Sequence, residues 1–513
     1  MIVDDFIQAP AVVVGGGIAG LATALSLEDC VLVSNGPIGE GSSRLAQGGI
    51  AAAIGRDDTP ALHAADTIRV GAELCEPDIV GLVTEAAASR ITWLRDLGTA
   101  FDLGADGAPL LGREAGHSRH RIVHAGGDRT GAAVMRALRA ATLQRPDIRR
   151  LEGFELVDLI TAGPRVAGVL LAHPDGRHLA VLAPHVVLAT GGIGACYSDS
   201  TNPATSRGAG LAAAARCGVR LADLEFMQFH PTALAVGGDP LPLLTEALRG
   251  AGAVLLDDAG HRFMPAIHPD AELAPRDVVA RSVAARRFAG REVLLDVTVI
   301  PDLEARFPGA CAIARAAGID PRARALPVTT AAHFHMGGIA TDANGASSLP
   351  GLWACGEVAA TGLHGGNRLA SNSLLEGLVF GERIARAIGE TRLPAPRGAL
   401  VIPRSRDLEP ADPERIDALR QLVSSSLGPL RAGTMMTAAL GRLEGWQAAS
   451  RAESDLLTNA GLALASALER RESRGAHYRS DHPAPRAEMA SRSFVTPSPA
   501  PVEPLAVTRS QVA

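Results

Sequence analysis

The feature that most constrains the fold is a glycine-rich turn between an apolar strand and a helix near the N-terminus. Residues 11–14 are apolar, the turn has the spacing G-x-G-x-x-G, and residues 21–27 have the composition of a buried helix. A second apolar strand follows at residues 30–34, so this stretch predicts a βαβ unit. Glycines in such a turn let the backbone approach a pyrophosphate at the helix N-terminus. We therefore expect dinucleotide contacts at Gly15, Gly16, Gly17, Ile18, Ala19 and Gly20, the alternative being a tight turn without a ligand.

Two later apolar strands also run into glycine-rich turns. Residues 186–189 lead into Thr190 and Gly191, and residues 352–354 lead into Gly356 and Glu357. Strands of this kind predict one parallel sheet assembled from distant segments. Between residues 224 and 335 the pattern changes to mixed strands and loops, which indicates an inserted domain. Residues 412–471 have helical periodicity and predict a small helical bundle.

The composition excludes several classes of protein. All 49 basic residues are Arg, so a pyridoxal phosphate enzyme and a Walker-type phosphate loop, which both need a Lys, are excluded. Aromatic residues make up 3% and the net charge is −6, which argues against nucleic-acid binding. The six cysteines form no C-x-x-C pair, so no metal site is expected. No apolar run reaches the length of a membrane span and no secretion signal is evident, so a cytoplasmic location is expected.

The residues after the second strand distinguish between nucleotides. An acidic residue at its end would bind an NAD ribose, but Ser34 and Asn35 stand there. Residues 40–53, with the string AQGGI at 46–50, resemble the flavin-contacting stretch of the fumarate reductase, succinate dehydrogenase and aspartate oxidase superfamily. The resemblance implies FAD, with contacts at Asn35, Ser42, Ser43, Ala46, Gln47, Gly48, Gly49, Thr190, Gly191, Glu357, Ser373 and Leu374.

Two positions depart from the superfamily pattern. Ser42 replaces the His that links covalently to the flavin in succinate dehydrogenases, so FAD is expected to be bound non-covalently. Ala209 replaces an Asp, so one cofactor contact is absent or is made by another group.

The superfamily's substrate residues recur in the same order along the chain. Four strings of this pattern lie at residues 227–232, 244–250, 331–338 and 364–378. The resemblance implies that His230, Thr245, His333 and Arg368 hold the two carboxylates of a dicarboxylic acid, and that Ser371 lies near the flavin at a helix N-terminus. Taken singly, each residue has an ordinary alternative, such as a structural His or a paired Arg.

Two further residues are implied to take part in the chemistry. Arg276 matches the fumarate reductase Arg that handles a proton at the carbon next to the hydride site, the alternative being a structural pair with Asp277. Glu114 matches the aspartate oxidase version of its loop, where a carboxylate pairs with the substrate ammonium. The alternative for Glu114 is a surface carboxylate paired with Arg113 or Arg121.

The resemblance covers roughly residues 10 to 483 and points to the L-aspartate oxidase branch of the superfamily. It implies oxidation of L-aspartate to iminoaspartate by hydride transfer to FAD, with reoxidation by O2 or fumarate. This is the first step of quinolinate and NAD biosynthesis, with quinolinate synthase as the downstream enzyme. A soluble fumarate reductase or succinate dehydrogenase flavoprotein, and a flavin-binding protein without catalysis, stay open as alternatives.

The expected fold is α/β with five parts. Residues 1–222 and 336–400 form two segments of a Rossmann-like FAD-binding domain, and residues 223–335 form an inserted α+β capping domain. Residues 393–410 read as a linker, residues 405–482 as a C-terminal helical domain, and residues 483–513 as a disordered tail.

Overall fold

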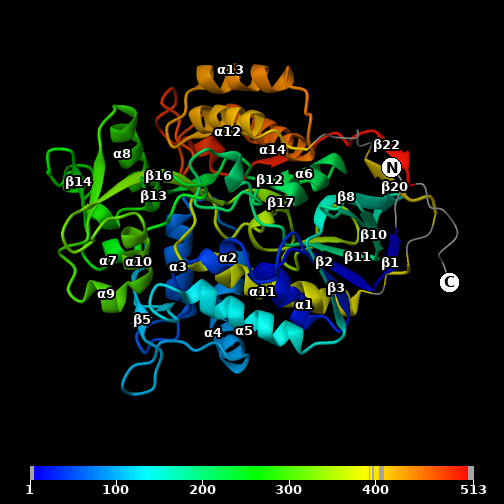
Figure 1. Cartoon of the computed structure of the whole chain (residues 1–513), viewed down its shortest axis with the longest axis horizontal. Coiled ribbons are helices and arrows are strands. Elements are labelled where there is room, and N and C mark those ends of the chain that lie inside the picture. The colour runs from blue at the N-terminus through cyan, green and yellow to red at the C-terminus, as the bar shows by residue number, and fades with distance from the viewer. Residues whose placement is uncertain (1–4, 392, 396–397, 404–409, 506–513) are drawn as a thin grey trace.

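The structure is a computed structural model that describes residues 5–391, 393–395, 398–403 and 410–505. Parts of the predicted linker, at 396–397 and 404–409, and the last eight residues of the predicted tail lie outside this range. At the centre is a parallel five-stranded sheet (Figure 1). In spatial order its strands are β18 (Leu352–Ala354), β11 (His185–Leu188), β2 (Ala11–Val14), β3 (Cys30–Ser34) and β7 (Ile148–Glu152). The prediction of a parallel sheet built from distant segments is confirmed.

The central sheet is buried on both faces, which explains why its strands are continuous apolar runs. Val12 and Val14 of β2 pack into one core, while Ala11 and Val13 pack into another on the opposite face. Helices form the second core: α1 (Ile18–Ser26), α4 (Pro77–Asp96), α5 (Thr130–Leu143) and α11 (Asn372–Glu390). The first core includes residues of a six-stranded sheet, ordered β1 (Asp5–Gln8), β10 (His178–Leu182), β9 (Arg165–Ala172), β8 (Glu155–Ala162), β20 (Val401–Pro403) and β22 (Val502–Pro504).

Helices α1 and α11 pack closely because small residues face each other. A Cβ atom at Gly381 would lie 2.8 Å from the Cβ of Ala22, and one at Gly377 would lie 3.2 Å from that of Ala19. The close contact brings residues at the N-terminal ends of both helices, Ile18 and Leu374, to one cavity. A short three-stranded sheet, β4 (Ile50–Ala51), β6 (Ile122–Val123) and β5 (Leu111–Gly112), and helices α2 (Ser42–Leu45) and α3 (Pro60–Val70) complete this part.

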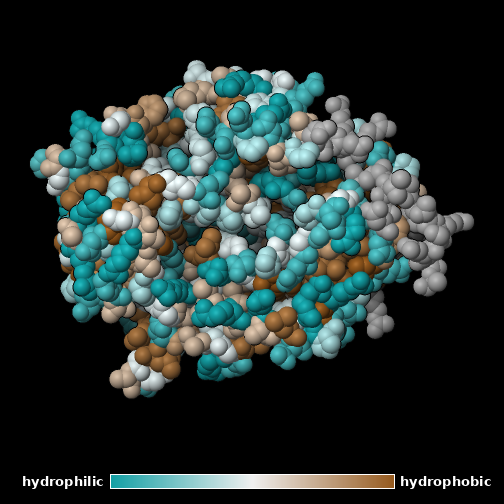
Figure 2. Space-filling model, viewed as in Figure 1, coloured by the Kyte–Doolittle hydropathy of each residue, from teal (hydrophilic) through white to brown (hydrophobic). Residues whose placement is uncertain are grey.

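The inserted region has a sheet and a core of its own. Its strands are β13 (Met227–Leu234), β16 (Leu326–His335), β15 (Val293–Asp296) and β14 (Val254–Asp257). Its helices are α7 (Ala247–Gly250), α8 (Arg276–Phe288), α9 (Leu303–Arg306) and α10 (Pro308–Ala316). The region is drawn in green at the left of Figure 1, and apolar side chains are scattered over its surface in Figure 2. One core cluster lies entirely within it and includes Leu244, Val279 and Leu295.

The C-terminal helices pack on the first core. These are α12 (Pro413–Leu427), α13 (Gly433–Glu444) and α14 (Arg451–Glu469), which lie over α6 (Ala209–Arg216) in Figure 1. Helix α14 begins where the Ser450 hydroxyl accepts a hydrogen bond from the Glu453 backbone N–H, which satisfies an otherwise free donor. The fold class is therefore confirmed: an α/β nucleotide-binding fold with an inserted α+β region and a helical C-terminal part.

The expectation of a disordered tail is wrong for residues 483–505. Strand β21 (Phe494–Val495) pairs with β12 (Leu221–Ala222), which also pairs with β17 (Gly338–Ala340), itself paired with β19 (Ala359–Ala360). Strand β22 pairs with β20. The Arg470 guanidinium donates to the backbone carbonyls of Met489 and Ser491. These contacts, with strands at sheet edges and with Arg470, hold the segment in place. They require no regular spacing of apolar residues, so the segment shows no periodicity in the sequence.

Two kinds of feature are absent from the described residues. No helix among them is long and apolar enough to cross a membrane. Within the same residues, no group of three or more His, Cys, Asp or Glu side chains is placed to hold a metal ion.

Candidate active site

One cavity of about 480 Å³ runs from the glycine turn after β2 to the inserted sheet. The surface is hollowed near the middle of the view in Figure 2, between the inserted region and the parallel-sheet region. Every catalytic and cofactor residue predicted from the sequence lines this cavity, except Gly20. A Cβ atom at Gly20 would lie 1.9 Å from the Gly15 carbonyl oxygen, so Gly20 permits close packing of the turn.

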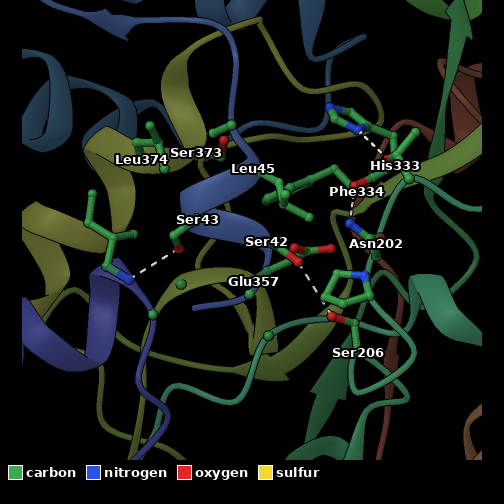
Figure 3. Close-up of a pocket in the computed structure, with 18 of the residues that line it drawn as sticks. Ser42, Ser43, Leu45, Asn202, Ser206, His333, Phe334, Glu357, Ser373 and Leu374 are labelled. Atoms are coloured by element: carbon green, nitrogen blue, oxygen red, sulfur yellow. Dashed lines mark hydrogen bonds between the residues drawn. The ribbon is translucent and has the colours of Figure 1, made fainter. Parts of the chain in front are cut away.

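The glycine turn leaves space and donors for an anion. Helix α1 begins after Gly17 without a side-chain cap, and only the Ile18 N–H is taken, by the Ser43 hydroxyl at 3.1 Å (Figure 3). Gly41 and Gly191 have positive φ values of 101° and 79°, and a Cβ atom on either would meet nothing within 4 Å. Free amides at a helix N-terminus beside open space fit a pyrophosphate.

Polar atoms without partners lie farther along the cavity. Among the described residues, Thr190 Oγ1 and Gln47 Oε1 are buried and accept or donate no hydrogen bond. The Gln47 amide N–H donates to the Leu243 carbonyl at 2.6 Å. A buried polar atom without a hydrogen-bond partner lowers the stability of the fold by about 1–3 kcal/mol. A bound ligand with polar groups would supply the missing partners of these two atoms. Together with the glycine turn, they fit the predicted FAD.

Glu357 lies at the edge of this part of the cavity. Its carboxylate accepts a hydrogen bond from the His335 backbone N–H at 2.9 Å. Burial raises the pKa of Glu357 to about 7. A carboxyl group with this pKa is able to accept or to donate a hydrogen bond, which suits the predicted contact of Glu357 with FAD, whose ribityl chain carries hydroxyl groups.

Two buried guanidinium groups meet at one amide where the inserted sheet faces α11. The Gln228 carbonyl oxygen accepts from Arg276 Nη1 at 2.8 Å and from Arg368 Nε at 3.2 Å. Arg276 Nε donates to Glu246 at 2.8 Å, and Arg368 Nη1 donates to the Ser373 hydroxyl at 2.7 Å. Burial, followed by the nearby charge of Arg276, lowers the pKa of Arg368 to about 9. Among the described residues, Arg368 bonds to an amide and a hydroxyl but forms no ion pair, and such a buried guanidinium favours a bound anion.

Two neutral histidines stand beside the guanidinium groups. The rings of His230 and His333 are 5.1 Å apart, and the pKa of each lies well below 6.5 because of burial and the nearby arginines. The Thr232 backbone N–H donates to His230 Nδ1 at 3.3 Å, so the His230 proton is on Nε2. His230 is therefore a neutral donor, suited to a carboxylate oxygen. The Thr201 hydroxyl lies 2.8 Å from His333 Nδ1.

Glu114 is buried on the side of the cavity formed by α11. Its carboxylate accepts a hydrogen bond from the Ser371 hydroxyl at 2.7 Å. Burial, followed by repulsion from Glu246, raises the pKa of Glu114 to about 6. Neither predicted alternative partner reaches it, since Arg113 donates to the His117 carbonyl and Arg121 pairs with Asp58 and Asp66. Glu114 is thus a buried acceptor with capacity for one cation.

Sequence reasoning assigned no role to two polar residues of the site, Gln228 and Glu246. Each lies in a string that contains a predicted residue: Gln228 with His230 at 227–232, and Glu246 with Thr245 at 244–250. Gln228 is fully buried within β13, where all eight residues are buried. Gln228 alternates with His230 and Thr232 along this buried strand, and this pattern was the available signal, because a buried amide needs partners.

The match to family models defines the class of the protein. Residues 11–374 match the model of an FAD binding domain, and residues 446–498 match the fumarate reductase flavoprotein C-terminal region. A variant of E. coli quinol fumarate reductase superposes with a TM-score of 0.86 at 26% identity, covering 99% of this chain and 98% of that chain. The protein is an FAD-binding flavoprotein of the fumarate reductase type.

Curated relatives narrow the class. An L-aspartate oxidase of Mesorhizobium japonicum is 46% identical over an alignment of 484 residues that covers 92% of this chain and 91% of the relative. One of Streptomyces coelicolor is 43% identical over an alignment of 517 residues that covers 93% of this chain and 89% of the relative. The chain belongs to the L-aspartate oxidase family.

We expect Gly17→Val to weaken FAD binding about tenfold or more, because a larger side chain would displace charged hydrogen bonds at the pyrophosphate. Gly17 has a φ of −81°, which any residue adopts, and its Cβ would meet only the Ser43 hydroxyl at 3.2 Å. The dissociation constant of FAD from the refolded apoprotein is the measurement. The control is Gly81→Val in α4, where a Cβ meets nothing within 4 Å. Equal affinity in wild type and Gly17→Val would contradict this placement.

Proposed function

We propose that the protein oxidises L-aspartate to iminoaspartate with FAD as the electron acceptor. The observation that carries the proposal is Glu114, a buried carboxylate in the same cavity as Arg276 and Arg368. L-Aspartate has two carboxylates and one ammonium. The cavity offers the guanidinium groups of Arg368 and Arg276, the latter already paired with Glu246, and the partly free carboxylate of Glu114. Glu114 is the group that succinate, which has no ammonium, would leave without a partner.

The side chains hold the substrate in one orientation. Arg368, His230 and His333 bind carboxylate oxygens, and the Thr245 hydroxyl donates to the distal carboxylate. Glu114 binds the ammonium and thereby orients the α-carbon. FAD, when bound, would supply the acceptor for the hydride that leaves this carbon, and the substrate ammonium would lose one proton before or during the same step. Binding in one geometry is the main contribution that the chain makes to such a reaction.

Arg276 handles the proton in the second half of the cycle. Reduction of fumarate needs a hydride at one carbon and a proton at its neighbour. Arg276 is hydrogen-bonded through Nη2 and Nε to Glu246, and Arg249 Nη2 lies 3.6 Å from the same carboxylate. We assign the donor role to Arg276, whose positive charge the Glu246 carboxylate stabilises, and the proton that Arg276 gives up is replaced from solvent. Both O2 and fumarate serve as final acceptors in the proposal.

The proposal extends to the fate of the product. An imine hydrolyses in water, so an enzyme that uses iminoaspartate has to act close to where it forms. We assign this role to quinolinate synthase, in the cytoplasm, as part of NAD biosynthesis. A succinate dehydrogenase is disfavoured by Glu114, and a flavin-binding protein without catalysis is disfavoured by the convergence of six polar substrate residues on one cavity.

Product analysis tests the reaction. The FAD-loaded protein is incubated in air with L-aspartate, D-aspartate or succinate, and hydrogen peroxide and ammonia are measured. Equimolar peroxide and ammonia from L-aspartate alone support the proposal. Peroxide without ammonia, or turnover of succinate alone, would contradict it.

The pH profile should carry the signature of Glu114. Its pKa is raised to about 6, so the charged form that pairs with an ammonium is lost as the pH falls through about 6. We expect kcat/KM for L-aspartate to fall about tenfold per pH unit below this point. Binding of fumarate, which has no ammonium, should lack this limb. An identical acid limb for both ligands would contradict the role of Glu114.

A further inference from the structure

Ser371, the partner of Glu114, has a strained backbone. Its φ is 64°, a left-handed conformation that few residues other than glycine adopt, and it precedes the first turn of α11. Strain of this kind persists only where neighbours fix the backbone. Both flanking residues are fixed by buried imidazoles: His117 Nε2 lies 2.9 Å from the Ala370 carbonyl oxygen, and His63 Nε2 lies 2.8 Å from Asn372 Oδ1.

The partners of His117 determine which of its ring nitrogens carries the proton. A carbonyl oxygen only accepts, so Nε2 is the donor to Ala370. A guanidinium only donates, so Nδ1 is the acceptor from Arg121 Nη1 at 3.3 Å. The ring is buried, which lowers its pKa to about 3. His117 is a neutral imidazole locked in one tautomer.

Arg121, which donates to His117 Nδ1, is itself held in place by several hydrogen bonds. Arg121 is fully buried and makes two hydrogen bonds to Asp58, at 2.8 and 2.9 Å, and one to Asp66 at 2.7 Å. Its own backbone N–H donates to the Gly112 carbonyl at 3.0 Å. The guanidinium is thus held from two sides, and it holds His117 in turn.

His117 and Glu114 lie on the same loop and reach the same segment. The His117 backbone N–H donates to the Glu114 carbonyl at 3.2 Å, so the two residues form one turn. From this turn, Glu114 binds Ser371 and His117 binds the preceding residue, Ala370. These two adjacent cross-links, together with the hydrogen bond from the Ala51 backbone N–H to the Ser371 carbonyl at 3.1 Å, define how the Ser371 hydroxyl faces the Glu114 carboxylate.

We propose that His117 is a positioning residue that holds Ser371 against Glu114 and thereby sets the recognition of the substrate's amino group. The inference rests on the proposed oxidation of L-aspartate. Without the His117 bond, the backbone at Ser371 relaxes and its hydroxyl leaves the carboxylate. The carboxylate-binding groups His230, His333 and Arg368 are not bonded to His117, so binding of a dicarboxylate without an amine is retained.

The test compares His117→Phe and wild type as full-length, FAD-loaded proteins. We expect KM for L-aspartate to rise at least tenfold, while the dissociation constant of fumarate, read from the flavin spectrum, changes less than twofold. His117→Gln keeps a donor for the Ala370 carbonyl and should recover most of the affinity. If His117→Phe does not retain FAD, His117→Asn, whose amide is too short to reach Ala370, replaces it with the same expectation.

His477 provides a matched control. It is fully buried, its Nε2 donates to the Arg470 carbonyl at 3.1 Å, and its Nδ1 accepts from Arg431 at 2.7 Å. It does not line the cavity. His477→Phe removes the same pattern of bonds and should change KM for L-aspartate and the fumarate constant equally, if at all.

Failure of the proposed function and failure of the proposed role of His117 give different results. Absence of L-aspartate turnover by the wild type overturns the proposed function, and the inference with it. With an active wild type, equal effects of His117→Phe on L-aspartate and fumarate, or no effect on either, overturn the inference alone.

Discussion

Glu114→Gln should lower kcat/KM for L-aspartate by about 100-fold or more. The substitution keeps the shape of the side chain and a hydrogen bond to Ser371 but removes the charge that pairs with the ammonium. Leaving one member of a buried ion pair without its partner costs about 3–5 kcal/mol. Because a difference of 1.4 kcal/mol is a factor of ten, this range corresponds to a loss of about 100-fold to several thousandfold. Steady-state kinetics with L-aspartate measure the loss.

Fumarate and a second buried carboxylate serve as controls for Glu114→Gln. The dissociation constant of fumarate should change little, because fumarate has no ammonium. Glu453 is fully buried at the start of α14 and does not line the cavity. Glu453→Gln therefore reports the general effect of losing a buried carboxylate. A loss shared by L-aspartate and fumarate would contradict the assignment of Glu114.

Arg276→Gln should separate the two electron acceptors. Fumarate reduction needs a proton at the carbon next to the hydride site, whereas oxidation of L-aspartate removes a proton from nitrogen. A positioned acid contributes about 10²–10⁴ in rate, so fumarate-dependent turnover should fall about 1,000-fold. Turnover with O2 should fall less, because it loses only the contribution of Arg276 to substrate binding.

The measurement is turnover of L-aspartate with fumarate under argon and with O2 in air. Arg281 is a control on the same helix: it pairs with Asp277, donates to the Gly475 carbonyl and does not line the cavity. Arg281→Gln should affect both acceptors alike. Equal losses for both acceptors in Arg276→Gln would show that Arg276 acts only in binding.

The parts of the fold that the sequence predicts are those with local signals. The strand at residues 11–14, its glycine turn and the helix that follows are adjacent in the chain, and the structure forms them as β2 and α1. The tail was mispredicted for the opposite reason. Strand β21 pairs with β12 at residues 221–222, and β22 pairs with β20 at residues 401–403. Pairing between segments so far apart in the chain leaves no periodic pattern in the sequence of the tail.

In the candidate site, too, the sequence predicts local features but not contacts between distant segments. Strings typical of the superfamily identified Glu114, Arg276 and Ser371, but they did not say which side chains touch. The bond between Ser371 and Glu114 joins residues 257 positions apart, and the meeting of Arg276 and Arg368 at Gln228 joins three elements. Contacts of this kind depend on how segments distant in the sequence face one another, which only the three-dimensional structure provides.

Anaerobic mixing of the FAD-loaded protein with L-aspartate, followed at the oxidised flavin band, tests the central claim most directly. We expect L-aspartate to bleach the band and succinate to leave it unchanged. Bleaching by succinate alone would mean that Glu114 does not select an amino acid. A flavin band left unchanged by both compounds would contradict the assignment of this cavity as the site of L-aspartate oxidation.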